Sequence, residues 1–166
     1  MDRTAKRIAI DGMLCAIAII FGYIETIIPI NLGIPGIKLG LANVVILFVI
    51  TTYKTSDAIM ISIIRVMVVG LLFGNVNSIM FSLAGAICSL CIMYCINKLQ
   101  TVSVIIVSLF GAILHIVGQL CIGIIWYPVK VLMYYGLFLL VAAVVTGIIN
   151  GMIVDMVKRC IYNKLI

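Results

Sequence analysis

Long apolar runs, separated by short polar breaks, make up nearly the whole chain. The runs show no alternation of apolar and polar positions with period two, so they predict helices rather than strands. Most approach the roughly 20 residues that a helix needs to cross a bilayer. We predict helices at about residues 6–28, 39–53, 56–74, 76–96, 101–126 and 130–157, with a loop at 29–38. The second helix is short for a span, so either it is steep or the loop before it completes the crossing.

Composition makes lipid the expected solvent for these helices. The 166 residues are 66% hydrophobic and only 10% charged, whereas a soluble domain averages about 45–50% apolar and about 25% charged residues. So few charges cannot cover a globule in water. Chains that span lipid are helical bundles or closed barrels, because every backbone polar group needs an internal partner. We therefore predict one all-α integral membrane domain over residues 1–166, a bundle of about six transmembrane helices.

Basic residues mark the ends of the predicted helices. Six spans place both termini on one side, and the basic residues of that side outnumber those of the other side by eight to two. This bias predicts cytoplasmic termini. It also explains the net charge of +6 without a nucleic-acid partner, since the charges do not form a stripe. The cytoplasmic group is Arg3, Lys6, Arg7, Lys54, Lys98, Lys158, Arg159 and Lys164, and the opposite group is Lys38 and Lys130.

Polar residues inside the membrane are costly and therefore point to function. At about 1.5 Å rise per residue, most of them fall in the outer half of the bundle, and they come from nearly every helix. His115 and Gln119 share one helix face at spacing i, i+4, and Arg65 lies near mid-membrane. We predict a pocket that opens outward and binds a small molecule. Its candidate residues are Glu25, Lys38, Asn43, Arg65, Asn77, His115 and Gln119.

Structural roles for the same residues stay open. Asn43, Asn77 and Gln119 could be hydrogen-bonding links between helices, as could His115. Glu25 could reach the interface or pair with Lys38. Arg65 needs a carboxylate, a phosphate or several carbonyls, so it is either an anion anchor or a central clamp.

Small residues recur on one face of the first helix, at Ala5, Ala9, Gly12 and Ala16. Such a stripe lets another helix approach closely. Similar pairs occur as Gly70/Gly74 and Gly147/Gly151. Each stripe either packs within the bundle or docks a partner membrane protein.

Catalytic signatures are missing from the sequence. We find no GxxxxGK[ST] loop, no HExxH, no GxSxG and no DDxxD pair. Only Glu25 among the five acids lies toward the outer side, so we predict neither an enzyme nor catalytic residues. Cys88, Cys91 and Cys95 share a helix face, but no histidine or carboxylate joins them in that segment, so we predict no metal site and no cofactor.

Several motifs resemble one family along nearly the whole chain. They are YIETIIP (Tyr23–Pro29), PGIKLGLAN (Pro35–Asn43), RVMVVGLLFG (Arg65–Gly74), SLAGAICSL (Ser82–Leu90), LHIVGQL (Leu114–Leu120) and VVTGIINGM (Val144–Met152). Because these motifs occur in this order along the chain, the sequence resembles the bacterial Gx transporter family, also labelled heptaprenyl diphosphate synthase component I. One departure is Ile116, where the family motif has Asn after the histidine.

The resemblance implies a substrate-binding S component of an energy-coupling factor (ECF) transporter in a bacterial plasma membrane. Such proteins capture a vitamin-like micronutrient from outside and dock, through small residues of the first helix, to a membrane coupling protein driven by two ATPases. A flavin-like or quinone-related cargo would suit the family. The synthase label implies a rival role, an accessory subunit for polyprenyl diphosphate or quinone synthesis, and a structural subunit of a membrane redox complex is a third possibility.

Overall fold

Six helices account for most of the chain. The computed structural model describes residues 3–27, 38, 40–99 and 101–165, and none of these residues lies in a strand. Five of the helices are long and apolar enough to cross a membrane. The prediction of an all-α membrane bundle is therefore confirmed, while most of the predicted loop at 29–38, with Pro29, Gly33, Pro35 and Gly36, lies outside the described residues. The helices are α1 (Arg3–Ile27), α2 (Asn43–Thr52), α3 (Thr55–Phe73), α4 (Val76–Asn97), α5 (Val104–Gly123) and α6 (Val129–Leu165).

The shortest of these helices, α2, lies at the centre of the bundle. Its ten residues measure about 15 Å at 1.5 Å per residue, half of a hydrocarbon core of about 30 Å. Seven of the ten are buried, and α2 contacts each of the other five helices. A helix that is apolar all round belongs in an interior. The predicted start at residue 39 was too early, because Gly40 has a positive φ of 85° and the helix begins only at Asn43.

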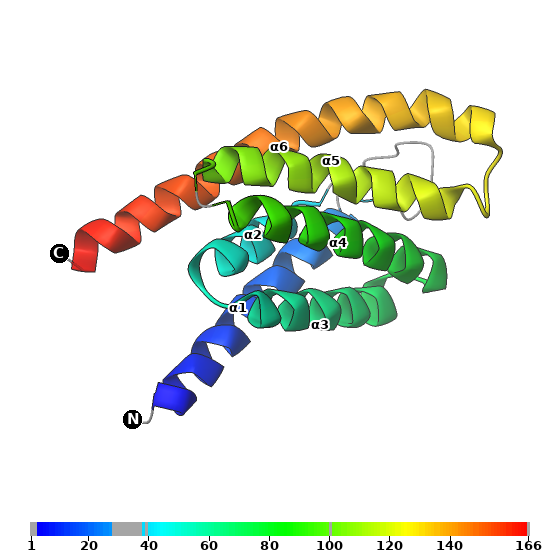
Figure 1. Ribbon diagram of the computed structural model, residues 1–166. Helices are drawn as coiled ribbons and strands as arrows, with labels where there is room; N and C mark the ends of the chain where they lie inside the picture. Colours follow the sequence, from blue (N-terminus) through cyan, green and yellow to red (C-terminus); the bar gives the residue numbers. More distant parts are fainter. Residues whose placement is uncertain (1–2, 28–37, 39, 100, 166) are drawn as a thin grey trace.

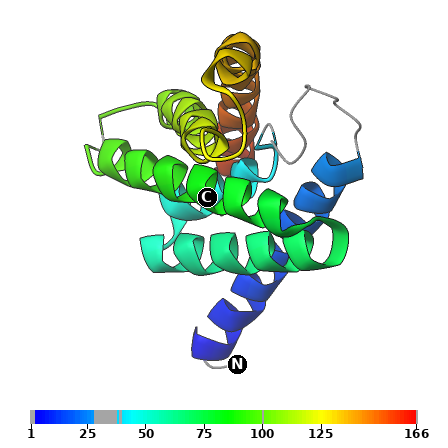
Figure 2. The ribbon, with the colours of Figure 1, turned by 90° about the vertical axis from the view of Figure 1, so that its right-hand side faces the viewer.

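The long helices surround α2. Neighbours α3, α4, α5 and α6 pack in chain order, and α1 crosses obliquely on the side of α3 (Figures 1 and 2). Glycines allow these close contacts: a Cβ on Gly118 would lie 2.6 Å from the Ala84 carbonyl oxygen, and one on Gly151 would lie 2.6 Å from the Ile105 Cα. A Cβ on Gly70 would overlap Ile79. The small residues of α3 and α6 therefore serve packing within the bundle.

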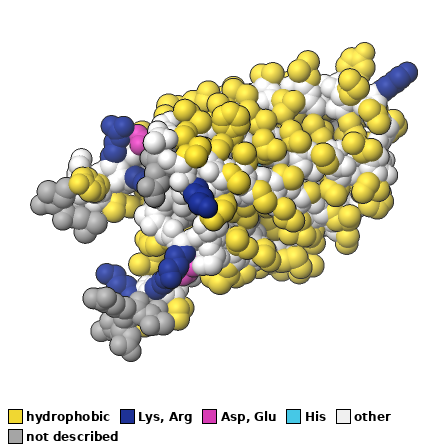
Figure 3. Space-filling model, in the orientation of Figure 1, with side chains coloured by type: hydrophobic (Ala, Val, Ile, Leu, Met, Phe, Trp, Pro, Cys, Tyr) yellow, Lys and Arg dark blue, Asp and Glu magenta, His cyan; other side chains and the backbone are white. Residues whose placement is uncertain are grey.

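Both chain ends lie at the same end of the bundle (Figure 1), as an even number of crossings requires. Lys and Arg side chains gather mainly at that end, and hydrophobic side chains cover most of the remaining surface in view (Figure 3). Helix α6 is longer than the predicted 130–157, since its 37 residues span about 55 Å. Its last turns lie beyond the apolar run, where an Asp155–Arg159 pair at 2.9 Å supports the helix.

Candidate functional site

The chain enters α2 through a short non-helical segment, and a buried glutamine holds the start of that segment. The Lys38 backbone N–H donates to Gln119 Oε1 at 3.1 Å, and Gln119 Nε2 donates to the Lys38 carbonyl oxygen at 3.0 Å. Gln119 is fully buried. A side-chain amide presents an N–H donor and a carbonyl acceptor side by side. The Gln119 amide therefore pairs with both backbone polar groups of Lys38, as a residue of a neighbouring strand would.

Two further side chains satisfy the backbone at Gly40. Glu25 Oε1 accepts from the Gly40 N–H and, at 3.3 Å, from the Leu41 N–H. Asn150 Nδ2 donates to the Gly40 carbonyl oxygen at 3.4 Å. Non-helical backbone at membrane depth is tolerated only when protein satisfies its polar groups. Glu25, Gln119 and Asn150 therefore have a structural role: they anchor the entry to α2 to α1, α5 and α6.

Gly40 brings that backbone against two more polar side chains. A Cβ at this position would lie 2.7 Å from Asn43 Nδ2 and 3.5 Å from His115 Cδ2. The positive φ is one that side-chain-bearing residues rarely adopt. Conformation and space both select glycine here.

Three polar atoms beside this segment have no hydrogen bond of good geometry among the described residues: Asn43 Nδ2, Arg65 Nε and His115 Nδ1. Their residues are 8%, 5% and 2% exposed. The His115 ring lies against the backbone of Gly85. Arg65 also reaches Asn43, with Nη2 3.5 Å from Oδ1. Most buried polar groups in proteins are hydrogen-bonded, so three unpartnered ones from α2, α3 and α5 in one place mark a candidate ligand site.

Positive charge predominates around the three atoms. The Arg65 guanidinium lies close enough to act electrostatically on Glu25 and on His115, yet no carboxylate of the described chain forms an ion pair with it. The suggested Glu25–Lys38 pair is not formed either, because Lys38 Nζ donates to Thr26 Oγ1 at 3.1 Å. The cationic groups of Arg65 and Lys38 thus lie near one carboxylate, that of Glu25, which already accepts hydrogen bonds from the backbone.

The structure brings six of the seven predicted binding residues together around Gly40. The exception is Asn77, which is exposed on the first turn of α4, apart from the buried cluster. Its neighbour Asn75 caps α4 by accepting from the Ser78 N–H at 2.8 Å. Sequence reasoning missed Asn150, although an amide in the middle of a predicted spanning helix was the signal that could have found it. The six residues are Glu25, Lys38, Asn43, Arg65, His115 and Gln119.

The stripe on α1 differs from the small residues of α3 and α6. Ala5, Ala9, Gly12 and Ala16 are all exposed. Among the described residues, a Cβ added at Gly12 would meet nothing within 4 Å. Packing against the described helices, the alternative that the sequence left open, therefore does not account for the stripe.

Comparison with known proteins bears on the chain as a whole. A family model described as heptaprenyl diphosphate synthase component I matches residues 14–157, which include all six helices in whole or in part. No curated protein and no solved structure shows a significant match. The matched segment covers most of the sequence and contains each of the six clustered polar residues. The chain belongs to the heptaprenyl diphosphate synthase component I family.

Proposed function

We propose that this membrane protein is the substrate-binding subunit of an uptake system for a small micronutrient, and that a separate ATP-driven module powers it. In this proposal the protein is not itself an enzyme. The cargo binds beside Gly40, in the half of the bundle that we assign to the outside. The observation that carries the proposal is the trio of buried atoms on Asn43, Arg65 and His115 that find no hydrogen-bond partner in the described part of the chain.

The trio also indicates what the cargo presents. Asn43 Nδ2 and Arg65 Nε are hydrogen-bond donors, and His115 Nδ1 either donates or accepts according to its protonation. An arginine without a carboxylate partner favours an anionic or carbonyl-bearing group. A vitamin-sized molecule with a carboxylate, phosphate or imide edge has that chemistry.

Direct detection of cargo tests this proposal. The tagged protein is extracted gently from its own host membrane, and native mass spectrometry reads its bound small molecules. Arg65→Gln removes the charge and should lower the fraction of protein that carries cargo at least tenfold. Arg159→Gln, an exposed arginine on the last turns of α6, is the matched control and should leave that fraction unchanged. Equal cargo in both variants, or an empty wild-type protein, would count against a binding role, provided that helicity and monodispersity are unchanged.

The exposed stripe of α1 supports a docking role in the same proposal. Small residues allow a partner helix to approach closely, and the stripe is open in this chain. Gly12→Trp has room in the monomer but would hold a partner helix away. We expect this variant to keep cargo and to lose uptake and the co-purified coupling protein. Leu71 of α3 is 69% exposed, so Leu71→Trp is the control and should transport normally.

The family description favours a second candidate, an accessory membrane subunit of polyprenyl diphosphate or quinone synthesis. Deletion of the gene would then change polyprenyl product lengths or amounts, whereas an uptake subunit would alter them only through its cargo. Co-purification of a polyprenyl synthase subunit, in place of a coupling protein and ATPases, would favour this second role.

A further inference from the structure

A basic pocket lies at the end of the bundle that carries both termini, far from the polar cluster around Gly40. The two sites are separated along α1 by the stretch from Lys6 to Glu25, about 28 Å of helix. The pocket has a volume of about 360 Å³. Its walls come from α1, from the end of α2 and from the connection to α3, and consist of Lys6, Arg7, Ile10, Thr52, Tyr53 and Lys54.

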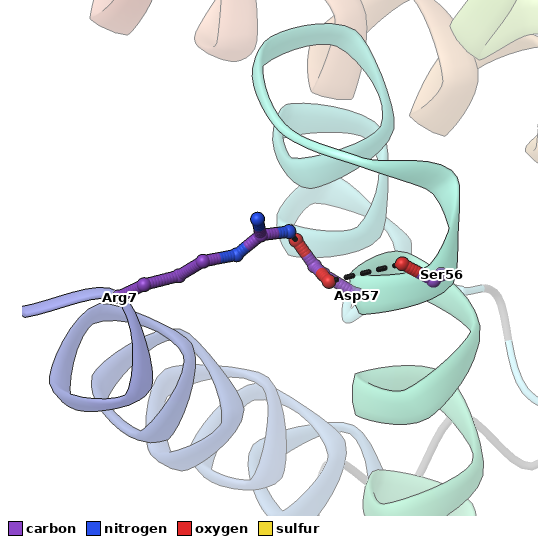
Figure 4. Close-up of polar contacts among 3 residues, drawn as sticks. All are labelled: Arg7, Ser56 and Asp57. Carbon is purple, nitrogen blue, oxygen red and sulfur yellow. Dashed lines mark hydrogen bonds and ion pairs between the residues drawn. The ribbon is translucent and has the colours of Figure 1, made fainter. Parts of the chain in front are cut away.

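Asp57 fixes one of the cations in place. Arg7 Nη2 donates to Asp57 Oδ2 at 2.5 Å, and Ser56 Oγ donates to the other carboxylate oxygen at 3.1 Å (Figure 4). Asp57 is largely buried at the first turn of α3, where a carboxylate also suits the helix dipole. The guanidinium is thereby held toward the pocket from α1 with one of its nitrogens engaged.

The pocket keeps an excess of positive charge. Three cations, those of Lys6, Arg7 and Lys54, line it. Two carboxylates lie nearby: Asp57 pairs with Arg7, and Asp11 lies one turn along α1 from Arg7 and is 9% exposed. In the part of the chain that the structure describes, no carboxylate forms an ion pair with Lys6 or Lys54. With both carboxylates counted, the net charge beside the pocket is still positive, which favours an anionic ligand.

Exposed apolar surface continues from the pocket along α1 and along the neighbouring helix α3. Met13, one turn from Ile10 on α1, is 59% exposed, and Met60, one turn from Asp57 on α3, is 45% exposed. In a bilayer such side chains contact acyl chains. Tyr53 lines the pocket and is 39% exposed, and aromatic residues typically lie at the level of the headgroups. The charges and the apolar faces together match a molecule with an anionic head and a hydrocarbon tail.

We propose that this pocket binds the phosphate headgroup of an anionic phospholipid, whose acyl chains lie along α1 and α3. Basic pockets between transmembrane helices are known to bind anionic headgroups. A soluble phosphate would use the cations but would gain nothing from Ile10 and its apolar neighbours. This site is independent of the proposed cargo site, so either can fail without the other.

Titration of delipidated protein in detergent, read by native mass spectrometry, tests the proposal. The probes are dioleoyl phosphatidylglycerol, dioleoyl phosphatidylcholine and, as the soluble phosphate, glycerol 3-phosphate. We expect the first phosphatidylglycerol to bind at least tenfold more tightly than phosphatidylcholine. A lysine near an anionic lipid contributes roughly fivefold in affinity, so Lys6→Ala/Lys54→Ala should weaken this first binding roughly 25-fold. Both lysines are exposed, so the variant should fold normally.

Lys98→Ala/Lys130→Ala removes the same charge from exposed positions elsewhere and should leave the preference intact. The proposal is overturned if the two double variants behave alike, or if wild type does not distinguish the two lipids. Tight binding of glycerol 3-phosphate, with no gain from acyl chains, would assign the pocket to a soluble phosphate and also overturn the lipid assignment.

Discussion

Replacement of Gly40 by alanine should destabilise the protein more than its single methyl group suggests. The residue has a positive φ of 85°, a conformation that costs a side-chain-bearing residue about 1–2 kcal/mol. The new Cβ would also lie 2.7 Å from Asn43 Nδ2, and overpacking of a tight site costs about 1–3 kcal/mol. The two effects together predict a loss of about 2–5 kcal/mol in the free energy of unfolding.

Gly12→Ala is the matched control for this change. Gly12 lies within α1, and its new Cβ would meet nothing within 4 Å. Alanine is preferred over glycine in a helix by about 1 kcal/mol, so this variant should be neutral or slightly more stable than wild type. The same chemical change is thus expected to have opposite signs at the two positions.

Unfolding by sodium dodecyl sulfate in mixed micelles, followed by circular dichroism, measures both variants. The reasoning is refuted if Gly40→Ala unfolds at the same detergent fraction as wild type, because both the backbone conformation and the contact with Asn43 would then be irrelevant. It is also refuted if Gly12→Ala is destabilised as much as Gly40→Ala, since glycine in general, rather than this site, would then be responsible.

Two other predictions concern single contacts. Gln119→Leu keeps much of the side-chain volume but leaves the Lys38 N–H and carbonyl without their partners. We expect the free energy of unfolding to fall by about 1–3 kcal/mol per unsatisfied group and hydrogen exchange at the Lys38 amide to become faster. Unchanged exchange there would contradict the anchoring role. Gly118→Ala would place a Cβ 2.6 Å from the Ala84 carbonyl oxygen, so α4 and α5 must move apart. We expect the free energy of unfolding to fall by about 1–3 kcal/mol in the same detergent titration. Wild-type stability would show that the two helices separate at little cost.

The architecture was predictable because it depends on features that are local in sequence. Apolar runs and their polar breaks locate the six helices, and an even number of crossings follows for the two termini. The ends of α2 and α6 were not predictable to the same degree. The start of α2 is set by the backbone of Gly40 and by partners on three distant helices. Helix α6 continues past its apolar run, where the Asp155–Arg159 pair at spacing i, i+4 supports it.

The candidate site was predictable in membership but not in function. Embedded Glu25 and Gln119 stood out by their cost in lipid, which says only that each needs a partner. The structure assigns those partners to the backbone beside Gly40, while Arg65 and His115 keep atoms that no described residue pairs with. No pattern in the sequence separates these two groups, because the separation depends on which side chains reach Lys38 and Gly40 across the bundle. The exposure of Gly12 was equally unpredictable from the sequence, because a stripe of small residues has the same spacing whether it packs against another helix or is exposed.

The short central helix also bears on how the chain is assembled in the membrane. A segment of ten residues is half the length at which a nascent chain is normally retained in the bilayer as an independent span. Its stability comes instead from contacts with all five other helices, and α6 is the last of these to be synthesised. During synthesis α2 is therefore fully packed only after the C-terminal half of the chain has been made. A protein truncated before α6 would leave Gly40 without Asn150 and one side of α2 without its packing partner. Quality control of this protein should accordingly act late, when α6 arrives, rather than helix by helix.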